Sequence, residues 1–169
     1  MKALLIRIDR GFSRLNQVLL FIGALSLIAA ALILSYSVLS RAMFHLATEW
    51  QDEAALFCLV GTTFICASYV QEKRGHIGIS AIDSLLPDRI NAARRLTIDI
   101  VSFLFFLFFS SKTWDLLHES WVEQQVTDST WGPPLWIPYL LMFLGMALLS
   151  FQLFLQILVR KQVAINKGH

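Results

Sequence analysis

The sequence has few charged residues. Only 15% of its 169 residues are Asp, Glu, Lys or Arg, whereas soluble domains average about 25%. Hydrophobic residues make up 56% of the chain, and 13 of them are phenylalanine. The net charge of +2 gives no reason to expect nucleic acid as a partner. A chain of this composition is predicted to fold within a lipid bilayer.

Motifs for catalysis and metal binding are also missing from the sequence. It has no glycine-rich phosphate loop followed by Lys and Ser or Thr, which argues against ATP hydrolysis by this chain. It has no HExxH pattern and no metal-type pair of cysteines. Cys58 and Cys66 are separated by about 12 Å along a helix, which is beyond disulfide reach. We therefore expect no enzymatic activity and no cofactor or metal bound to this chain.

Four apolar runs are long enough to cross a bilayer as helices, which takes about 20 residues each. The predicted spans are approximately 15–40, 50–71, 96–117 and 135–159. Asp99 and Lys112 lie near the ends of the third span, and Lys112 is expected to snorkel to the interface. The remaining tails and loops are short. We predict an all-α membrane protein whose four transmembrane helices form one domain over residues 1–169, with an almost purely apolar midplane.

Basic residues indicate the orientation of these spans. Most Lys and Arg residues lie in three segments, 2–14, 73–95 and 160–167, and only Arg41 and Lys112 lie on the opposite side. Positive charge marks the cytoplasmic side of a membrane protein. Both termini are therefore predicted to be cytoplasmic.

The loop between the second and third spans has a pattern of its own. Hydrophobic residues recur at helical spacing within residues 77–86, and Pro87 follows them. This pattern predicts a short amphipathic helix that lies in the membrane surface between helices 2 and 3.

The first outer segment combines one cation with several carboxylates. Arg41 ends the first span, and Trp50, Asp52 and Glu53 open the second. Negative charge is favourable in the first turn of a helix, and tryptophan is typical of the headgroup region. We expect Arg41 to pair with Asp52 or Glu53, either to fix this helix hairpin or to bind a partner.

The second outer segment is acidic and rich in tryptophan and proline. Trp131 and Trp136 are expected to lie in an interfacial belt, and Pro134 prevents a helix before the fourth span. Two interpretations of the segment are open: a solvated loop, or a docking surface for a protein outside the membrane.

Taken in order, these features resemble the small membrane subunit of tripartite ATP-independent periplasmic (TRAP) transporters, the DctQ-like component. The resemblance covers nearly the whole chain, including its length and four-span topology. The residues proposed for structural or partner contacts are Arg41, Trp50, Asp52, Glu53, Gly61, Arg74, His76, Asp83, Pro87, Trp131, Pro134, Trp136 and Gly145.

The resemblance implies a multi-pass subunit of the bacterial inner membrane, surrounded by lipid. It would form a heterodimer with a large membrane subunit, which moves an organic acid anion inward with sodium by an elevator mechanism. A periplasmic substrate-binding protein would deliver the anion. The small subunit would be a scaffold, so no substrate or sodium residues are assigned to this chain.

Two alternatives to this scaffold function are open. A membrane anchor of a redox complex would bind haem or quinone. An independent small transporter would need charged groups and broken helices near the midplane, and the apolar spans argue against it.

Overall fold

The computed structural model describes residues 2–44, 49–73 and 88–166. Within these ranges the regular elements are helices, apart from one isolated β-bridge. The helices are α1 (Lys2–Phe44), α2 (Glu49–Glu72), α4 (Asp88–Val122) and α5 (Trp136–Asn166). All four are long and apolar enough to cross a membrane, which confirms the predicted fold class at this level.

One predicted element falls outside the described residues. The amphipathic helix expected over residues 77–86 lies there, as do four of the proposed contact residues: Arg74, His76, Asp83 and Pro87.

The helices are longer than the apolar runs that predicted them. α1 has 43 residues and α4 has 35, about 65 and 52 Å at 1.5 Å per residue. The hydrocarbon core of a bilayer is only about 30 Å thick. Hydropathy marks the part of a helix that lies in lipid, whereas the helix itself continues through polar residues for as long as its backbone hydrogen bonds do.

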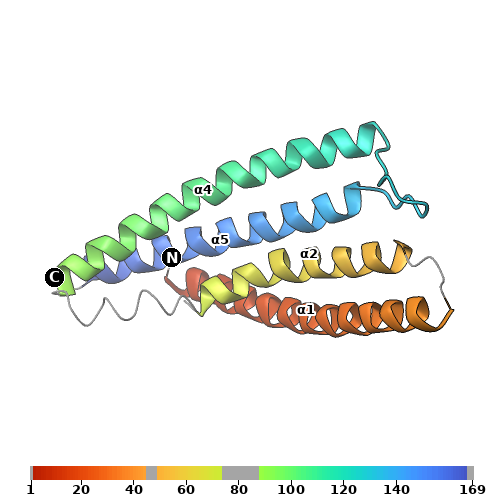
Figure 1. Cartoon of the computed structure of the whole chain (residues 1–169). Coiled ribbons are helices and arrows are strands. Elements are labelled where there is room, and N and C mark those ends of the chain that lie inside the picture. Colours follow the sequence, from red (N-terminus) through yellow and green to blue (C-terminus); the bar gives the residue numbers. More distant parts are fainter. Residues whose placement is uncertain (1, 45–48, 74–87, 167–169) are drawn as a thin grey trace.

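The four helices lie side by side in a single row, in the order α1, α2, α5, α4 (Figure 1). The last helix of the chain therefore lies between α2 and α4. In α5 33% of the apolar window is buried, compared with 11% in α1 and in α4. α2 and α5 thus form the centre of the row, and α1 and α4 form its two edges.

The two ends of this row differ. α1 begins and α5 ends at the same end of the row (Figure 1), which we call the terminus end. α1 and α4 end, and α2 and α5 begin, at the opposite end, which we call the hairpin end.

The connection from α4 to α5 is compact. Gln124 has a φ of 51°, and the N–H of Gln125 bonds to the carbonyl of Ser120 at 3.1 Å, which ends α4 in the manner of a Schellman motif. An isolated bridge joins Val126 to Pro134, and the N–H of Leu135 bonds to the carbonyl of Gln125 at 3.0 Å. The segment therefore folds back on itself before α5 begins.

Candidate partner interface

Glycine residues bring the two central helices together. A Cβ atom at Gly145 of α5 would overlap the backbone carbonyl of Phe64 in α2. A Cβ at Gly61 of α2 would lie 3.1 Å from Cδ1 of Leu141 in α5. Apolar side chains gain little from leaving lipid for each other, so membrane helices depend on such close backbone approach. Gly61 and Gly145, two of the predicted contact residues, are thus placed within this chain's own α2–α5 contact.

The contact between α1 and α2 follows a regular pattern that the sequence analysis missed. Asn16, Gly23, Ala30 and Ser37 recur every seven residues, and all four are buried. The hydroxyl of Thr62 donates to the carbonyl of Gly23 at 3.1 Å across this contact. A seven-residue repeat of small residues on a helix is the signal that indicates this face.

A polar cluster joins three helices near the terminus end. The amide of Asn16 in α1 donates to Oε2 of Glu72 in α2 at 2.8 Å and to Oε1 of Gln152 in α5 at 3.4 Å. Ser13 donates to the other oxygen of the Glu72 carboxylate at 2.8 Å. Asn16 is 0% exposed and Gln152 is 2% exposed. The cluster fixes the register of α1, α2 and α5 at once.

Two further polar contacts connect α2 and α5. Gln71 donates to the side-chain oxygen of Gln156 at 3.1 Å, and Gln156 donates back to the carbonyl of Gln71 at 3.0 Å. The hydroxyl of Ser68 donates to the carbonyl of Leu148 at 3.3 Å. α2 and α5 therefore place polar side chains on the faces that meet.

An ion pair joins α1 and α2 at the hairpin end. Arg41 pairs with Asp52, and Ser37 connects the two, donating to Oδ1 of Asp52 at 3.2 Å and accepting from Arg41 at 2.9 Å. Of the two carboxylates expected as partners of Arg41, the structure pairs Asp52 with it.

The other carboxylates of this turn hold the α4–α5 connection. Glu53 accepts a hydrogen bond from the hydroxyl of Ser129 at 2.8 Å. Glu49 accepts from the N–H and the hydroxyl of Thr130, at 3.2 and 2.6 Å. The second outer segment is thus attached to the start of α2. Its function as a docking surface stays a prediction.

The tryptophans of the hairpin end form two edge-to-face pairs. The rings of Trp50 and Trp131 are 6.4 Å apart, and those of Trp121 and Trp136 are 5.1 Å apart. The first pair adds an apolar contact between α2 and the attached segment, and the second closes the hairpin end of α4 and α5. Amphipathic rings of this kind are typical of the membrane–water boundary.

The third span differs from expectation at Lys112. Its ammonium lies 3.0 Å from Oδ2 of Asp115, one turn further along α4, and both side chains are more than 60% exposed. α4 continues for ten residues beyond Lys112, so the residue is not near the end of its helix. That Lys112 reaches the interface and that the midplane is almost purely apolar both stay predictions, because α4 is longer than the predicted span. Asp99, a third charged residue of the predicted span, is 3% exposed and faces protein.

Contacts between helices show where this ion pair lies along the length of the row. Gly61, midway along α2, faces Leu141 of α5. Two residues further, the ring of Phe143 lies 5.2 Å from that of Trp114 in α4. Asp115 is thus level with the middle of α2. It lies six residues before Trp121 on α4, about 9 Å deeper than the tryptophan pair at the hairpin end.

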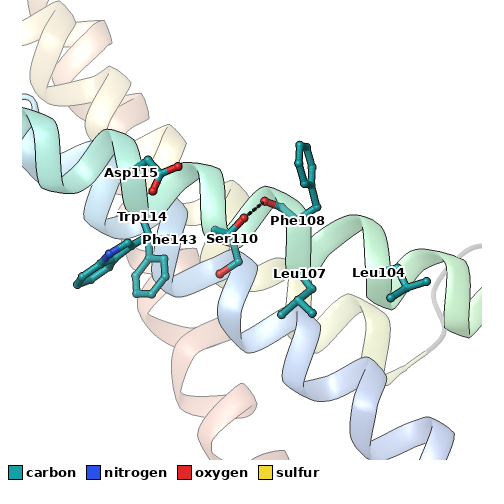
Figure 2. A pocket seen from close by; sticks show the side chains of 8 residues that line it. Leu104, Leu107, Phe108, Ser110, Trp114, Asp115 and Phe143 are labelled. Carbon is teal, nitrogen blue, oxygen red and sulfur yellow. Dashed lines mark hydrogen bonds between the residues drawn. The ribbon is translucent and has the colours of Figure 1, made fainter.

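A groove of about 580 Å³ runs beside this ion pair, between α4 and α5 (Figure 2). Phe143 of α5 lies beside Trp114, and the remaining wall comes from α4 (Figure 2). The lining residues are Leu104, Leu107, Phe108, Ser110, Ser111, Trp114, Asp115 and Phe143. The groove is mainly apolar but has a carboxylate and two hydroxyls at its side, a composition suited to a protein helix.

The described residues contain no group of three or more His, Cys, Asp or Glu side chains that could hold a metal ion. Cys58 and Cys66 are free thiols and half-buried. The described residues form contact surfaces between helices, along the row and at its hairpin end.

The chain matches a known protein family. The model of the family described as "Tripartite ATP-independent periplasmic transporters, DctQ component" matches residues 30–162, well over half of the chain. No curated protein and no solved structure matched the chain.

Proposed function

Because the chain belongs to the DctQ component family of TRAP transporters, it is a transporter component and not an enzyme, and we propose that it braces a larger membrane subunit. That large subunit would carry an organic acid anion inward together with sodium, with its mobile part moving like an elevator. This chain would extend the stationary frame, and it would hold neither the anion nor the sodium ion itself.

The observation that carries this proposal is the single row of helices (Figure 1). A closed four-helix bundle directs most of its contact-forming side chains inward. A row leaves both broad faces and both edges free for other molecules. Its internal contacts are distributed along its length: the Arg41–Asp52 ion pair at the hairpin end, glycine contacts in the middle, and the Asn16–Glu72 cluster near the terminus end. Such a row is suited to a stationary frame.

The proposed orientation places the terminus end in the cytoplasm of a bacterium and the hairpin end in the periplasm. The bias of Lys and Arg toward the terminus-end segments supports it. The membrane-surface helix over residues 77–86, with Arg74, His76, Asp83 and Pro87 around it, would then anchor the frame on the cytoplasmic side.

The hairpin end would help a periplasmic substrate-binding protein to dock. The attached segment, which includes Trp131 and Pro134, is held on α2 by Glu49 and Glu53. A surface held in this way is ordered before binding, which lowers the entropic cost of association. The family match gives no support to the alternative of a redox anchor.

Co-purification tests the proposed function. The tagged chain would be isolated from native membranes in mild detergent, and its partners identified by mass spectrometry. We expect a stoichiometric, much larger polytopic membrane protein without an ATPase. A haem protein or flavoprotein in its place would overturn the proposal, and isolation of the chain alone would reopen the case for an independent transporter.

A further inference from the structure

The two edges of the row expose different chemistry to their surroundings. On α1, residues 15–40 contain no charged side chain. On α4, a stripe of exposed side chains includes Lys112 and Asp115, level with the middle of α2. We define the α4 stripe by its helical spacing and exposure: Leu104, Phe108, Ser111, Lys112 and Asp115.

Lipid is a poor environment for the α4 stripe. Charged side chains inside a membrane nearly always face protein or water, because hydrocarbon cannot solvate them. Asp115 is too short to reach the headgroups, since it lies about 9 Å deeper than the tryptophan pair. Lys112 lies deeper still, and its ammonium is bonded to Asp115 and not extended toward a membrane surface. The pair neutralises the net charge of the two groups but leaves both side chains more than 60% exposed.

The groove between α4 and α5 adds shape to this chemistry. It lies along the α4 stripe, and Phe143 and Trp114 form its wall toward the hairpin end (Figure 2). The groove is shallow and open to the outside, so large apolar side chains of a neighbouring helix can lie against it. The hydroxyl of Ser111 donates to the carbonyl of Phe108 at 2.7 Å, and its oxygen can still accept a hydrogen bond. An acyl chain would fill the groove but would leave the ion pair without polar contacts.

We propose that the α4 stripe and its groove receive a transmembrane helix of the large subunit. That helix would place large apolar side chains in the groove and a hydrogen-bond donor or cation beside Asp115. The inference rests on the proposed function and goes further, because it assigns the partner to the α4 edge and leaves the α1 edge to lipid.

Photo-crosslinking at two matched phenylalanines tests the assignment. Phe108 on α4 and Phe21 on α1 are 59% and 66% exposed. Gly23 of α1 and Gly145 of α5 both pack on the same part of α2, so they lie at nearly the same level of the row. Phe21 lies two residues from Gly23, on the side of the terminus end. Phe108 lies on the same side of that level, because Trp114, six residues further along α4, contacts Phe143. The two positions therefore sample nearly the same depth on opposite edges. Each would be replaced in turn by p-benzoylphenylalanine in the full chain, in native membranes.

We expect the probe at Phe108 to crosslink to the large subunit and the probe at Phe21 to crosslink to lipid. Three results would overturn the assignment: a large-subunit crosslink through Phe21 alone, a crosslink of Phe108 to a second copy of this chain, or a crosslink of Phe108 to lipid only. Co-purification from the same membranes separates the two levels of inference. If the large subunit co-purifies but Phe108 does not reach it, the assignment fails and the proposed function stands.

An exchange of the two charges tests the ion pair itself. The double variant Lys112→Asp with Asp115→Lys keeps an ion pair within α4 but reverses the charges that a partner would meet. We expect the retained large subunit to fall by about tenfold or more, with the melting temperature of the isolated chain unchanged. Full retention of the large subunit would show that the pair serves only its own helix, which would contradict the proposal.

Discussion

Hydropathy does not separate the centre of the helix row from its edges: the mean hydropathy of the spanning window is 1.6 in α2 and 2.0 in α5, compared with 2.7 in α1 and 1.5 in α4. The centre and the edges are nevertheless built from different residues. Where α2 meets α5, and where α1 meets α2, the contact residues are small or polar, such as Gly145, Gly23 and Asn16. The outward faces of α1 and α4 are covered by large apolar residues such as Phe21 and Phe108. In a membrane, large apolar side chains do not specify which helices meet. Close backbone approach and hydrogen bonds do.

The largest loss of stability is expected from Gly145→Leu at the centre of the row. The new side chain would overlap the backbone of Phe64, which cannot move without separating α2 from α5. We expect the free energy of unfolding, measured by SDS titration in mixed micelles, to fall by about 3 kcal/mol or more.

The matched control is Gly11→Leu on α1, where a Cβ has no neighbouring atom within 4 Å. Its expected effect is neutral or slightly stabilising, because leucine favours helix by up to about 1 kcal/mol relative to glycine. Equal losses in the two variants would show that the close approach of α2 and α5 is not what holds the centre together.

A smaller loss is expected from Asn16→Leu, which removes a buried donor shared by Glu72 and Gln152. Leaving those acceptors without it should lower the free energy of unfolding by about 1–3 kcal/mol. The neighbouring residue Gln17 is exposed, so Gln17→Leu is the control and should be neutral. A neutral Asn16→Leu would mean that the cluster contributes no stability.

The Arg41–Asp52 ion pair at the hairpin end should contribute less to the free energy of unfolding than the Asn16 cluster does. The side chains of Arg41 and Asp52 are 52% and 47% exposed, and exposed pairs contribute about 1 kcal/mol at most. A double-mutant cycle of Arg41→Gln and Asp52→Asn should give a coupling energy of this size. The same cycle with Glu53→Gln in place of Asp52→Asn should be additive, because Glu53 bonds to Ser129. Coupling of Arg41 to Glu53 alone would contradict the pairing in the structure.

The smallest effect is expected at the edge of the row. Leu32 of α1 is 65% exposed, so Leu32→Ala should change the free energy of unfolding by no more than about 0.5 kcal/mol. SDS titration of this variant beside Gly145→Leu gives the contrast between edge and centre directly. A loss at Leu32 as large as at Gly145 would remove the distinction.

Much of the fold could be predicted from sequence, because an apolar run of about 20 residues is long enough to cross a bilayer as a helix. Gly61 and Gly145 could also be identified, since glycine inside a long apolar helix indicates close approach. The order of the row could not be predicted. Small and polar residues indicate which face of a helix meets another helix, but not which helix it meets, so the sequence does not show that α5 lies between α2 and α4.

Polar residues account for the other differences between the sequence prediction and the structure. Lys112 was assigned to the end of its span because the apolar run stops there, whereas the helix itself continues for ten residues to Val122. Asn16 lies just inside the first span and resembles an interfacial residue, although it is fully buried against Glu72. The seven-residue repeat that begins with Asn16 was visible in the sequence and would have identified this contact.

Reconstituted uptake tests the central claim most directly, namely that this chain braces a transporter and does not carry the substrate itself. Liposomes would contain this chain alone, the large subunit alone or both, with the binding protein and a sodium gradient supplied in each case. The account predicts no uptake by this chain alone and the highest uptake when both membrane subunits are present. Uptake of an organic acid anion by this chain alone would contradict it.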